Sequence, residues 1–450
     1  MSIRQLGVEL RARRLTARGL VDACLTRIDR LNPLVNAFTF INREGARAAA
    51  EHSDRLLDAG APRGPLEGIP CALKDNLIAR DMPATWGSRL FANYVGDRDE
   101  TPVARLRAAG AVFLGKTNVP EFTLRGYTAN AIHGVTGNPW NPALTPGGSS
   151  GGAAAAVAAG MVPFALATDG GGSIRRPAGH TGLVGLKPGR DVAPRGGGFP
   201  EINFDFEVVG PLARRVDDAR LVLDCLSRGR PSTPIGARHL RILCVDTIDG
   251  APVDPDIRAS FADAIERMRG LGHVVERGPL PFDIAPAIAV MPMFSNSGLA
   301  MIAREHPDFD ARVGADFVAA AREGEKRSAP ELMAAIEAIK RFRAEVEEQC
   351  APFDVIATPT TAAQPWPAAT EYPPVIDGRP VGPRGHAIFT GWVNACGRPA
   401  LSVPMRPAPD GMPIGLHLVG APGSDALLLD LAESLEAIFD GPRFWPAMAA

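Results

Sequence analysis

The chain has 450 residues, which is enough for one large core or for two to three smaller domains. Hydrophobic residues make up 46% of the chain and charged residues 22%, as is ordinary for a soluble globular protein. The 48 Lys and Arg residues nearly balance the 50 Asp and Glu residues, so the net charge of −2 gives no electrostatic reason to expect a nucleic acid or an anionic membrane as a partner.

The first 60 residues are predicted to be mainly helical. Apolar residues recur on one face of a segment that begins after Thr16, a residue suited to cap a helix N-terminus. Pro33 marks the expected end of this helix, because proline disrupts a helix interior. A short strand at residues 37–41 and a second helix to about residue 59 follow. The N-terminus is rich in arginine and has no apolar stretch, so it does not resemble a secretory signal.

Short apolar strands then alternate with helices. Strands are expected at residues 68–74, 111–118 and 162–167, and helices at residues 102–109 and 153–159. This alternation favours an α/β layer structure with a largely parallel sheet. The uncharged stretch 143–168 is long enough to span a bilayer. However, it is rich in alanine and glycine and contains two prolines, so we expect it to be buried inside a soluble protein.

The second half of the chain is predicted to be richer in helices. A segment rich in Gly and Pro at residues 191–206 reads as a loop, and helices dominate from about residue 256 to residue 350. Later strands and a final helix are expected at residues 354–358, 400–404, 414–420 and 424–439. No internal repeat and no long linker divides the chain.

The cysteines do not indicate a metal site or a disulfide framework. None of them forms a CxxC-type pair, and no histidine lies at a zinc-like interval from any of them. We expect reduced core thiols in a cytoplasmic protein. The six residues are Cys24, Cys71, Cys225, Cys244, Cys350 and Cys396.

Two glycine-rich stretches are the most informative parts of the sequence. GGSSGG begins at Gly147, and TDGGGS begins at Thr168. Neither is a nucleotide-binding motif, because there is no GxxxxGK[ST] and no GxGxxG that opens a helix after a strand. In the first stretch, Ser150 is suited to cap the alanine-rich helix that follows it.

Ser173 is the candidate nucleophile of the second stretch. Three glycines precede it, and their lack of side chains allows backbone N–H groups to point into one small space, as a developing oxyanion requires. A serine also needs a base. His180, His133 or His417 could serve, because such partners meet only in the fold. Lys74, at the end of an apolar strand, could serve if burial lowered its pKa, although such lysines usually reach solvent.

Together these stretches resemble the amidase signature family of serine amidohydrolases. GIPCALKDNL from Gly68, NPWNPALTPGGSSGG from Asn138 and TDGGGSIRRPAGHTGLVGLKP from Thr168 look like the family's lysine, Gly-Ser and nucleophile blocks. The resemblance continues through GPLARRVDDA and GRPALSVP, so it covers most of the chain. The order of the three blocks, with 75 residues between Lys74 and Ser149 and 24 between Ser149 and Ser173, makes a highly specific signature.

The resemblance implies an α/β fold with a large, twisted, mostly parallel mixed β-sheet flanked by helices on both faces. It implies one amidase domain over residues 1–450. Within that domain, residues 1–60 would form a helical portion that many members use in dimerisation, which allows a homodimer. Residues 61–210 would form the signature core, and residues 211–450 would complete the sheet and supply the helices of the substrate pocket.

The resemblance also implies a Ser–Ser–Lys triad. Ser173 would attack the amide carbonyl, Ser149 would relay a proton, and a neutral Lys74 would be the base. A cis peptide bond to Gly148 would hold the backbone of Ser149. No metal and no organic cofactor would be needed. The backbone N–H groups implied to form the oxyanion hole are those of Gly170, Gly171, Gly172 and Ser173.

Some residues near Ser173 depart from the family pattern or carry charge. Gly170 stands where the family usually has threonine, which leaves the backbone donors but loosens the loop. Asp169 and Arg175 are expected to form an ion pair beneath this loop. Arg176 is the candidate for substrate binding, because malonamidase-like members use an arginine at this position to hold a substrate carboxylate. Its alternative role is to pair with a nearby acidic residue.

The implied function is an amidohydrolase that cleaves the C–N bond of a small-molecule amide through an acyl-enzyme and releases ammonia or an amine. One alternative is a glutaminase-type A subunit of a tRNA-dependent amidotransferase, although the chain is shorter than typical members of that subfamily. Hydrolysis of a urea-derived amide of the biuret or allophanate type stays open, as does a non-catalytic binding protein. The expected partner is the amide substrate, with no nucleic acid and no membrane.

Overall fold

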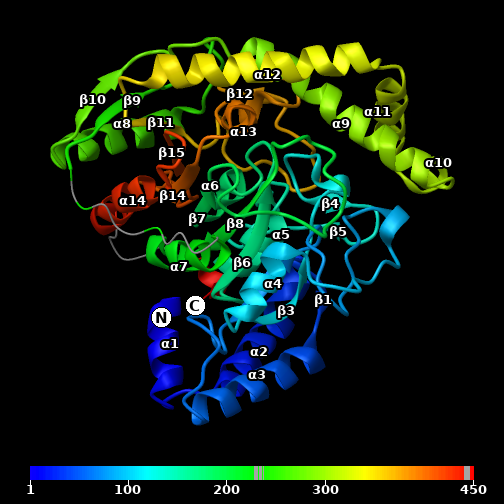
Figure 1. Ribbon diagram of the computed structural model, residues 1–450. Helices are drawn as coiled ribbons and strands as arrows, with labels where there is room; N and C mark the ends of the chain where they lie inside the picture. The colour runs from blue at the N-terminus through cyan, green and yellow to red at the C-terminus, as the bar shows by residue number, and fades with distance from the viewer. Residues whose placement is uncertain (228–231, 233–235, 237, 440–445, 450) are drawn as a thin grey trace.

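The computed structural model describes residues 1–227, 232, 236, 238–439 and 446–449. Figure 1 shows a central sheet with helices around it. The helices are α1 (Ile3–Arg11), α2 (Ala17–Val35), α3 (Arg43–Asp58), α4 (Thr101–Ala108), α5 (Gly151–Ala158), α6 (Arg175–Thr181), α7 (Val216–Leu226), α8 (Pro255–Gly270), α9 (Ala285–Glu305), α10 (Phe309–Arg312), α11 (Ala315–Glu325), α12 (Ala329–Cys350), α13 (Gly391–Cys396) and α14 (Asp425–Phe439).

One large sheet has 11 strands. In spatial order they are β1 (Phe38–Ile41), β3 (Val112–Thr117), β2 (Pro70–Lys74), β6 (Phe164–Asp169), β8 (Val208–Ala213), β7 (Val184–Lys187), β14 (Ala400–Pro404), β15 (Gly415–Gly420), β11 (Val355–Pro359), β9 (Arg241–Cys244) and β10 (Val274–Arg277). Two small hairpins pair β4 (Ala129–Asn130) with β5 (Gly134–Val135) and β12 (Val375–Ile376) with β13 (Arg379–Pro380).

The mixed sheet flanked by helices is confirmed, but it is less parallel than expected. β2 is parallel to β3 and β6, and β9 is parallel to β10 and β11, whereas the other neighbours in the sheet are antiparallel. Two antiparallel segments explain the difference. β8 runs antiparallel to both β6 and β7, and the consecutive strands β14 and β15 pair directly, without the crossover helix that parallel strands need.

The centre of the sheet is apolar on both faces. All residues of β2, β3, β6, β7 and β8 are buried, which suits strands covered by helices on each side. α5 packs against β2, β6 and β8, and every one of its residues is also buried. Its glycines, which have no side chain, and its small alanine side chains allow this close approach. At Gly152, a Cβ atom would lie 2.4 Å from the backbone nitrogen of Asn118, so only glycine fits there.

Helix α2 is longer than predicted. Thr16 caps α2 as expected, since its side chain accepts a hydrogen bond of 3.0 Å from the Gly19 N–H. The prediction that Pro33 ends the helix is wrong, because α2 continues to Val35 with Pro33 inside it. The helix ends at Asn36, which takes a left-handed conformation and donates its N–H to the Asn32 carbonyl. A proline this close to a helix end removes one hydrogen bond without stopping the last turn.

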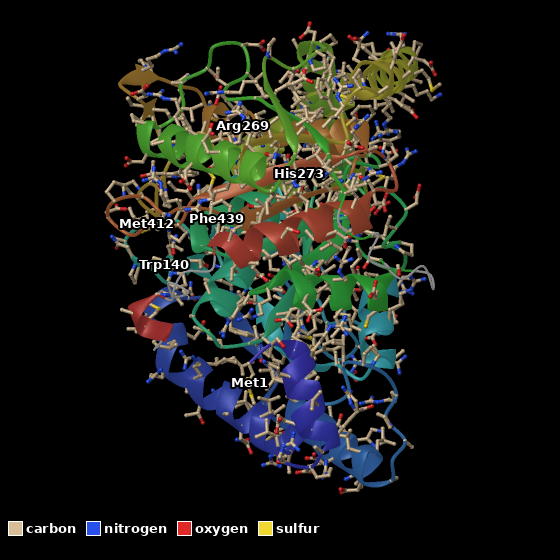
Figure 2. The ribbon with its side chains drawn as sticks, turned by 90° about the vertical axis from the view of Figure 1, so that its left-hand side faces the viewer. Met1, Trp140, Arg269, His273, Met412 and Phe439 are labelled. Atoms are coloured by element: carbon tan, nitrogen blue, oxygen red, sulfur yellow. The ribbon has the colours of Figure 1, made fainter. Side chains whose placement is uncertain are left out.

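The two views agree on how the rest of the chain surrounds the sheet. α1, α2 and α3 lie at one end of the molecule, and α9, α11 and α12 lie at the opposite end (Figures 1 and 2). α14 packs on β14 and β15, and α8 packs on β10 and β11. In Figure 2 these two helices cover the side of the sheet that faces the viewer, where Phe439 and Arg269 are labelled.

α9 is the one helix, among the residues that the structure describes, that is long and apolar enough to cross a membrane by length and composition alone. It packs against α11, α12 and α13, and Ile288 and Met291 on it line the cavity described below.

The uncharged stretch 143–168 is mostly buried, as expected, and contains α5 and most of β6. The six cysteines are free thiols.

Candidate active site

Lys74 is the last residue of β2, and its side chain is completely buried. Its Nζ lies 2.8 Å from Ser149 Oγ, 2.9 Å from Thr168 Oγ1 and 3.1 Å from the Thr168 carbonyl oxygen. A neutral amine has two N–H groups and one lone pair. The carbonyl can only accept, so when the two N–H groups point to Thr168, the lone pair is left for the Ser149 hydroxyl. The contacts of Lys74 therefore suit an amine that accepts a proton from Ser149.

The environment of Lys74 favours the neutral amine. Burial lowers the pKa of Lys74 to about 7. The carboxylates of Glu207 and Asp169 partly oppose this shift, and the guanidinium groups of Arg195 and Arg176 add to it. A base with a pKa near the working pH combines a large neutral fraction with useful basicity.

Ser149 is held by the tight loop before α5. The Gly148–Ser149 peptide bond is cis, as the family resemblance implies, and Ser149 is buried. A Cβ atom on Gly148 would lie 2.4 Å from the Tyr127 carbonyl oxygen, and Gly147 has a φ of 86°. The two glycines therefore allow the loop to bring Ser149 against Lys74.

Ser150 does not cap α5 as predicted. It stands at the N-cap position, but its side chain makes no hydrogen bond to the first turn and instead donates to the Thr168 carbonyl at 3.2 Å. Thr128 Oγ1, from another part of the chain, accepts the Gly151 N–H at 3.1 Å. The backbone N–H of Ser150 donates to the Ser173 carbonyl at 3.1 Å, which ties the Gly-Ser loop to the nucleophile loop.

Ser173 lines a cavity of about 400 Å³ together with Gly170 and Gly171. It is nearly buried, with 6% of its surface exposed. Within the described part of the chain, no hydrogen bond joins its hydroxyl to that of Ser149. The structure thus brings Lys74 into contact with Ser149. It places Ser173 in the adjoining loop, where the Ser173 carbonyl accepts a hydrogen bond from the Ser150 N–H.

The Gly172 N–H is not available to an oxyanion, contrary to the prediction. It donates to Asp169 Oδ1 at 2.7 Å. The glycine is needed for another reason, because its φ is 114° and a Cβ atom would lie 2.2 Å from Thr390 Oγ1. The N–H groups of Gly170, Gly171 and Ser173 remain as candidates, since these residues line the cavity.

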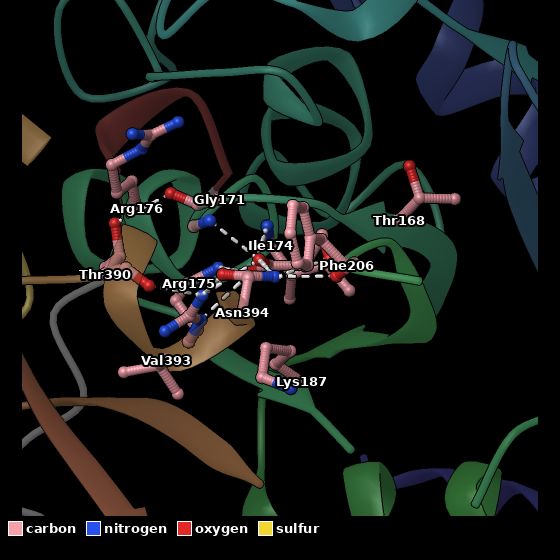
Figure 3. Close-up of polar contacts among 12 residues, drawn as sticks. Thr168, Gly171, Ile174, Arg175, Arg176, Lys187, Phe206, Thr390, Val393 and Asn394 are labelled. Carbon is pink, nitrogen blue, oxygen red and sulfur yellow. Dashed lines mark hydrogen bonds and ion pairs between the residues drawn. The ribbon is translucent and has the colours of Figure 1, made fainter. Parts of the chain in front are cut away.

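Asp169 and Arg175 form the ion pair that the sequence predicts (Figure 3). Both side chains are fully buried, with Arg175 Nη2 2.9 Å from Asp169 Oδ1. Asn394 Nδ2 donates to Asp169 Oδ1 at 3.0 Å, and the Ile174 N–H donates to Oδ2 at the same distance. Burial by itself would raise the pKa of Asp169, but Arg175 and the Ile174 N–H hold this pKa well below its usual value.

Replacing Arg175 with methionine is expected to destabilise the protein by about 3–5 kcal/mol, because it leaves the Asp169 charge buried and unpaired. Urea unfolding followed by circular dichroism measures this loss. Arg277→Met is the control, since it removes an ion pair to Asp246 that is roughly half exposed and should change stability by less than about 1 kcal/mol. Equal losses in the two variants would contradict the structural role of the buried pair.

The histidines that the sequence left open as bases do not contact Ser173 or Ser149 in the described structure. His180 is buried, its Nε2 lies 3.3 Å from the Ala363 carbonyl oxygen, and burial lowers its pKa to about 4. His417 lies between Thr358 and Arg175, and the Nε2 of His133 is 3.2 Å from Thr85 Oγ1. Lys74 is therefore the basic group that the geometry favours.

Arg176 lines the same cavity and is buried. Its Nη2 donates to the Gly148 carbonyl at 3.2 Å, whereas Nε and Nη1 have no hydrogen-bond partner in the described part of the chain. Figure 3 shows its guanidinium turned away from Arg175 and Asn394. No acidic side chain forms an ion pair with Arg176 among the described residues, which does not support its alternative role as a partner of a nearby acid.

Part of the cavity lining is apolar. Ile284 precedes α9, Ile288 and Met291 lie on it, and Ile388 lies just before α13. Sequence reasoning missed Ile284, Ile288 and Ile388 because segments far from the signature blocks supply them. It also missed Asn76 and Thr168, although both lie inside those blocks. Among the described residues, no group of three or more His, Cys, Asp and Glu side chains is arranged to hold a metal ion.

Residues 19–429 match the Amidase family model, so the chain belongs to the amidase family, whose members are also called amidase signature enzymes. It is 34% identical to the glutamyl-tRNA(Gln) amidotransferase A subunit of Acidothermus cellulolyticus, over 97% of this chain and 95% of the relative.

Solved structures of the same family have the same fold. A 6-aminohexanoate cyclic dimer hydrolase superposes with a TM-score of 0.91 at 26% identity, covering 100% of this chain and 99% of the other. A bacterial aryl acylamidase gives a TM-score of 0.91 at 26% identity, covering 100% and 98%. The peptide amidase of Stenotrophomonas maltophilia gives 0.84 at 29% identity, covering 100% and 99%. The protein is therefore an amidase-family enzyme, a hydrolase of amide C–N bonds.

Proposed function

We propose that the protein is an amidase that hydrolyses a small-molecule amide through an acyl-enzyme. Ser173 is the nucleophile, Ser149 the proton relay and Lys74 the base. The observation that carries this proposal is the fully buried Lys74 amine, whose Nζ lies 2.8 Å from Ser149 Oγ. The loop that contains Ser149 is hydrogen-bonded to the backbone of Ser173 through Ser150. A serine pair and a desolvated lysine replace the histidine and carboxylate of other serine hydrolases.

The reaction begins with two linked proton transfers. Ser149 gives its proton to Lys74 Nζ and takes the proton of Ser173 as the Ser173 oxygen attacks the amide carbon. The hydrogen bond between the two hydroxyls forms when substrate orders the site, since catalytic contacts often tighten only in the complex. The N–H groups of Gly170, Gly171 and Ser173 bind the oxyanion, and a donor of this kind contributes roughly 10²–10³ in turnover.

Collapse of the tetrahedral intermediate breaks the C–N bond. The proton held by Lys74 returns through Ser149 to the leaving nitrogen, so ammonia or an amine departs and Ser173 keeps the acyl group. A water molecule then replaces the amine, gives its proton to the same relay and attacks the ester. Release of the carboxylic acid restores the Ser173 hydroxyl and neutral Lys74.

The cavity supports a small substrate. Its volume of about 400 Å³ lies within the range of small-molecule sites, and it joins an apolar wall to the cationic Arg176. We propose that Arg176 binds a carboxylate of the substrate, because two of its nitrogens have no partner in the described structure.

Replacing Arg176 with alanine is expected to raise KM about 10–100-fold for amides that carry a carboxylate. The KM for neutral amides should stay nearly unchanged. The loss follows from removing a charge-assisted hydrogen bond that only the acidic substrates make. Steady-state kinetics on a matched pair, such as a dicarboxylic acid monoamide and the monoamide of its methyl ester, measures the difference. Equal losses on both substrates would remove this role of Arg176.

A panel of primary, aryl and dicarboxylic acid monoamides tests the proposed function, with release of ammonia or amine as the readout. The wild-type enzyme should turn over at least one class and accumulate an acyl adduct on Ser173 that mass spectrometry detects. A protein that is folded but inactive on every amide, and whose Ser173 does not react with a fluorophosphonate, would contradict the proposal.

A second candidate function is that of the glutaminase component of a tRNA-dependent amidotransferase. The observation that favours it is the 34% identity to such a component over nearly the full length of both chains. A protein of this kind would release ammonia from glutamine only in the presence of charged tRNA and the other components of the complex. Hydrolysis of other amides by the isolated chain, with no response to glutamine, would favour the stand-alone amidase.

A further inference from the structure

A chain of hydrogen bonds connects Lys74 to a carboxylate outside the triad. Thr168 Oγ1, 2.9 Å from Lys74 Nζ, accepts a hydrogen bond of 3.1 Å from Asn76 Nδ2. Asn76 Nδ2 also donates to Glu207 Oε1 at 3.2 Å. The contacts follow from the sheet, because Asn76 lies just after β2, Thr168 is on β6 and Glu207 comes just before β8, and these three strands are neighbours.

The Gly- and Pro-rich loop also holds Glu207, through the same oxygen atom that accepts from Asn76. Arg195 Nη1 donates to Glu207 Oε1, and Arg195 Nη2 lies 3.7 Å from Glu100 Oε2. A small cavity of about 10 Å³ lies between Asn76, Arg195, Glu201 and Glu207, roughly the space of one water molecule. Asn76 Oδ1 is buried without a hydrogen-bond partner in the described structure, so a water here would satisfy it.

Charged groups reach Lys74 from several elements. Asp169 at the end of β6 and Glu207 before β8 favour its ammonium form, whereas Arg195 from the loop and Arg176 from α6 favour the neutral amine. Glu207 makes the larger of the two opposing contributions that raise the pKa of Lys74.

Besides Lys74, the charged groups that interact with Glu207 include Arg195, Glu100 and Glu201. Glu207 thus combines a charge that acts on Lys74 with a hydrogen bond that leads to it.

An ionised carboxylate can only accept hydrogen bonds. Glu207 therefore turns the NH₂ group of Asn76, and not its oxygen, toward itself and toward Thr168. This orientation holds Thr168 Oγ1 beside the Lys74 amine. The negative charge also opposes the effect of burial, so the amine keeps enough basicity to take a proton at neutral pH.

We propose that Glu207 is a positioning residue for the Lys74 base. Through Asn76 and Thr168 it orients the amine toward Ser149, and its negative charge helps the buried amine to hold a proton. The inference rests on the proposed function of Lys74. It assigns to Glu207 more than the structural task of holding Arg195 and its loop.

NMR titration of Lys74 tests the inference directly, because the chain contains only five lysines: Lys74, Lys116, Lys187, Lys326 and Lys340. Protein labelled with ¹³C at the lysine ε carbon gives one signal for each of them, and Lys74→Met assigns the signal of interest. In Glu207→Gln, the pKa of Lys74 is expected to fall by about one unit. The matched control is Glu201→Gln, which removes a carboxylate from the same small cavity without touching Asn76 and should leave the titration in place.

A second variant reverses the sign and covers a Glu207→Gln protein that does not fold. Arg195→Gln removes a positive charge that favours the neutral amine, so the pKa of Lys74 should rise. Opposite shifts in the two variants support the inference. An unchanged Lys74 titration in folded Glu207→Gln, or shifts of the same sign in both variants, would overturn it.

Labelling of Ser173 by a fluorophosphonate separates this inference from the proposed function. The acid limb of the labelling rate against pH should move to lower pH in Glu207→Gln together with the Lys74 titration. A wild-type Ser173 that stays unlabelled at every pH overturns the proposed function alone. A reactive Ser173 whose pH profile does not move in Glu207→Gln overturns the inference alone.

Discussion

Replacing Ser173 with alanine is expected to lower kcat for amide hydrolysis by at least about 10⁴-fold and to abolish covalent labelling. The substitution removes the oxygen that forms the acyl-enzyme, and the loss of a serine nucleophile is among the largest single-residue effects known in hydrolases. The oxyanion donors and the cavity remain, so substrate binding should change little. Ammonia release, together with intact-protein mass spectrometry after fluorophosphonate treatment, measures both effects.

Ser150→Ala is the control for this prediction. Ser150 is next to Ser149 in the sequence, yet its hydroxyl contacts the Thr168 carbonyl and neither Lys74 nor the cavity. Its loss removes one hydrogen bond, so the rate should stay within about tenfold of wild type. If Ser173→Ala keeps its activity while Ser150→Ala loses it, the assignment of the two serines is wrong.

Replacing Lys74 with methionine is expected to lower the rate of Ser173 acylation by about 10²–10⁴-fold, the usual contribution of a general base. The pH dependence should disappear as well. Since the neutral amine is the proposed active form and burial lowers its pKa to about 7, the wild-type rate should rise as pH increases through 7 and level off above it. Methionine has similar length but no proton to exchange, so the remaining rate should lack this rise.

Rates of fluorophosphonate labelling of Ser173, measured between pH 5 and pH 9, test the role of Lys74. These limits lie about two pH units on either side of the expected pKa of Lys74. Lys340→Met is the control, because Lys340 is exposed on α12 and pairs only with Glu337 in the described structure. A rise centred near pH 7 that persists in Lys74→Met would assign the titrating group elsewhere.

The strands that lead into the proposed triad could be predicted from the sequence, as could β3 beside them, whereas β8 could not. The strands expected at residues 68–74 and 111–118 contain all of β2 and β3, and the strand expected at residues 162–167 contains most of β6. β8 was missed although it is central and buried, because Gly210 and Pro211 interrupt it and proline rarely occupies a central strand. Its pairing with β6 places Pro211 opposite Leu166, an arrangement that only the tertiary structure establishes.

The candidate site shows the same division. The contact between Lys74 and Ser149 could be expected from the family resemblance, whereas the roles of Ser150 and Gly172 could not. Thr128 binds the Gly151 N–H in place of Ser150, and the Asp169 carboxylate binds the Gly172 N–H. Both outcomes depend on which polar group lies close enough to accept the hydrogen bond in the folded protein. Local sequence carries little information about partners that meet only through folding.

The proposed catalytic residues and the apolar residues of the cavity come from separate parts of the chain. Lys74, Ser149 and Ser173 come from β2 and from the loops that flank α5 and α6, whereas Ile288 and Met291 come from α9, which packs on α11, α12 and α13. Changes of side-chain size on α9 can therefore alter which molecules fit while the reacting groups keep their places. The fold offers an evolving lineage, or a protein engineer, a route to new substrates that leaves the underlying chemistry in place.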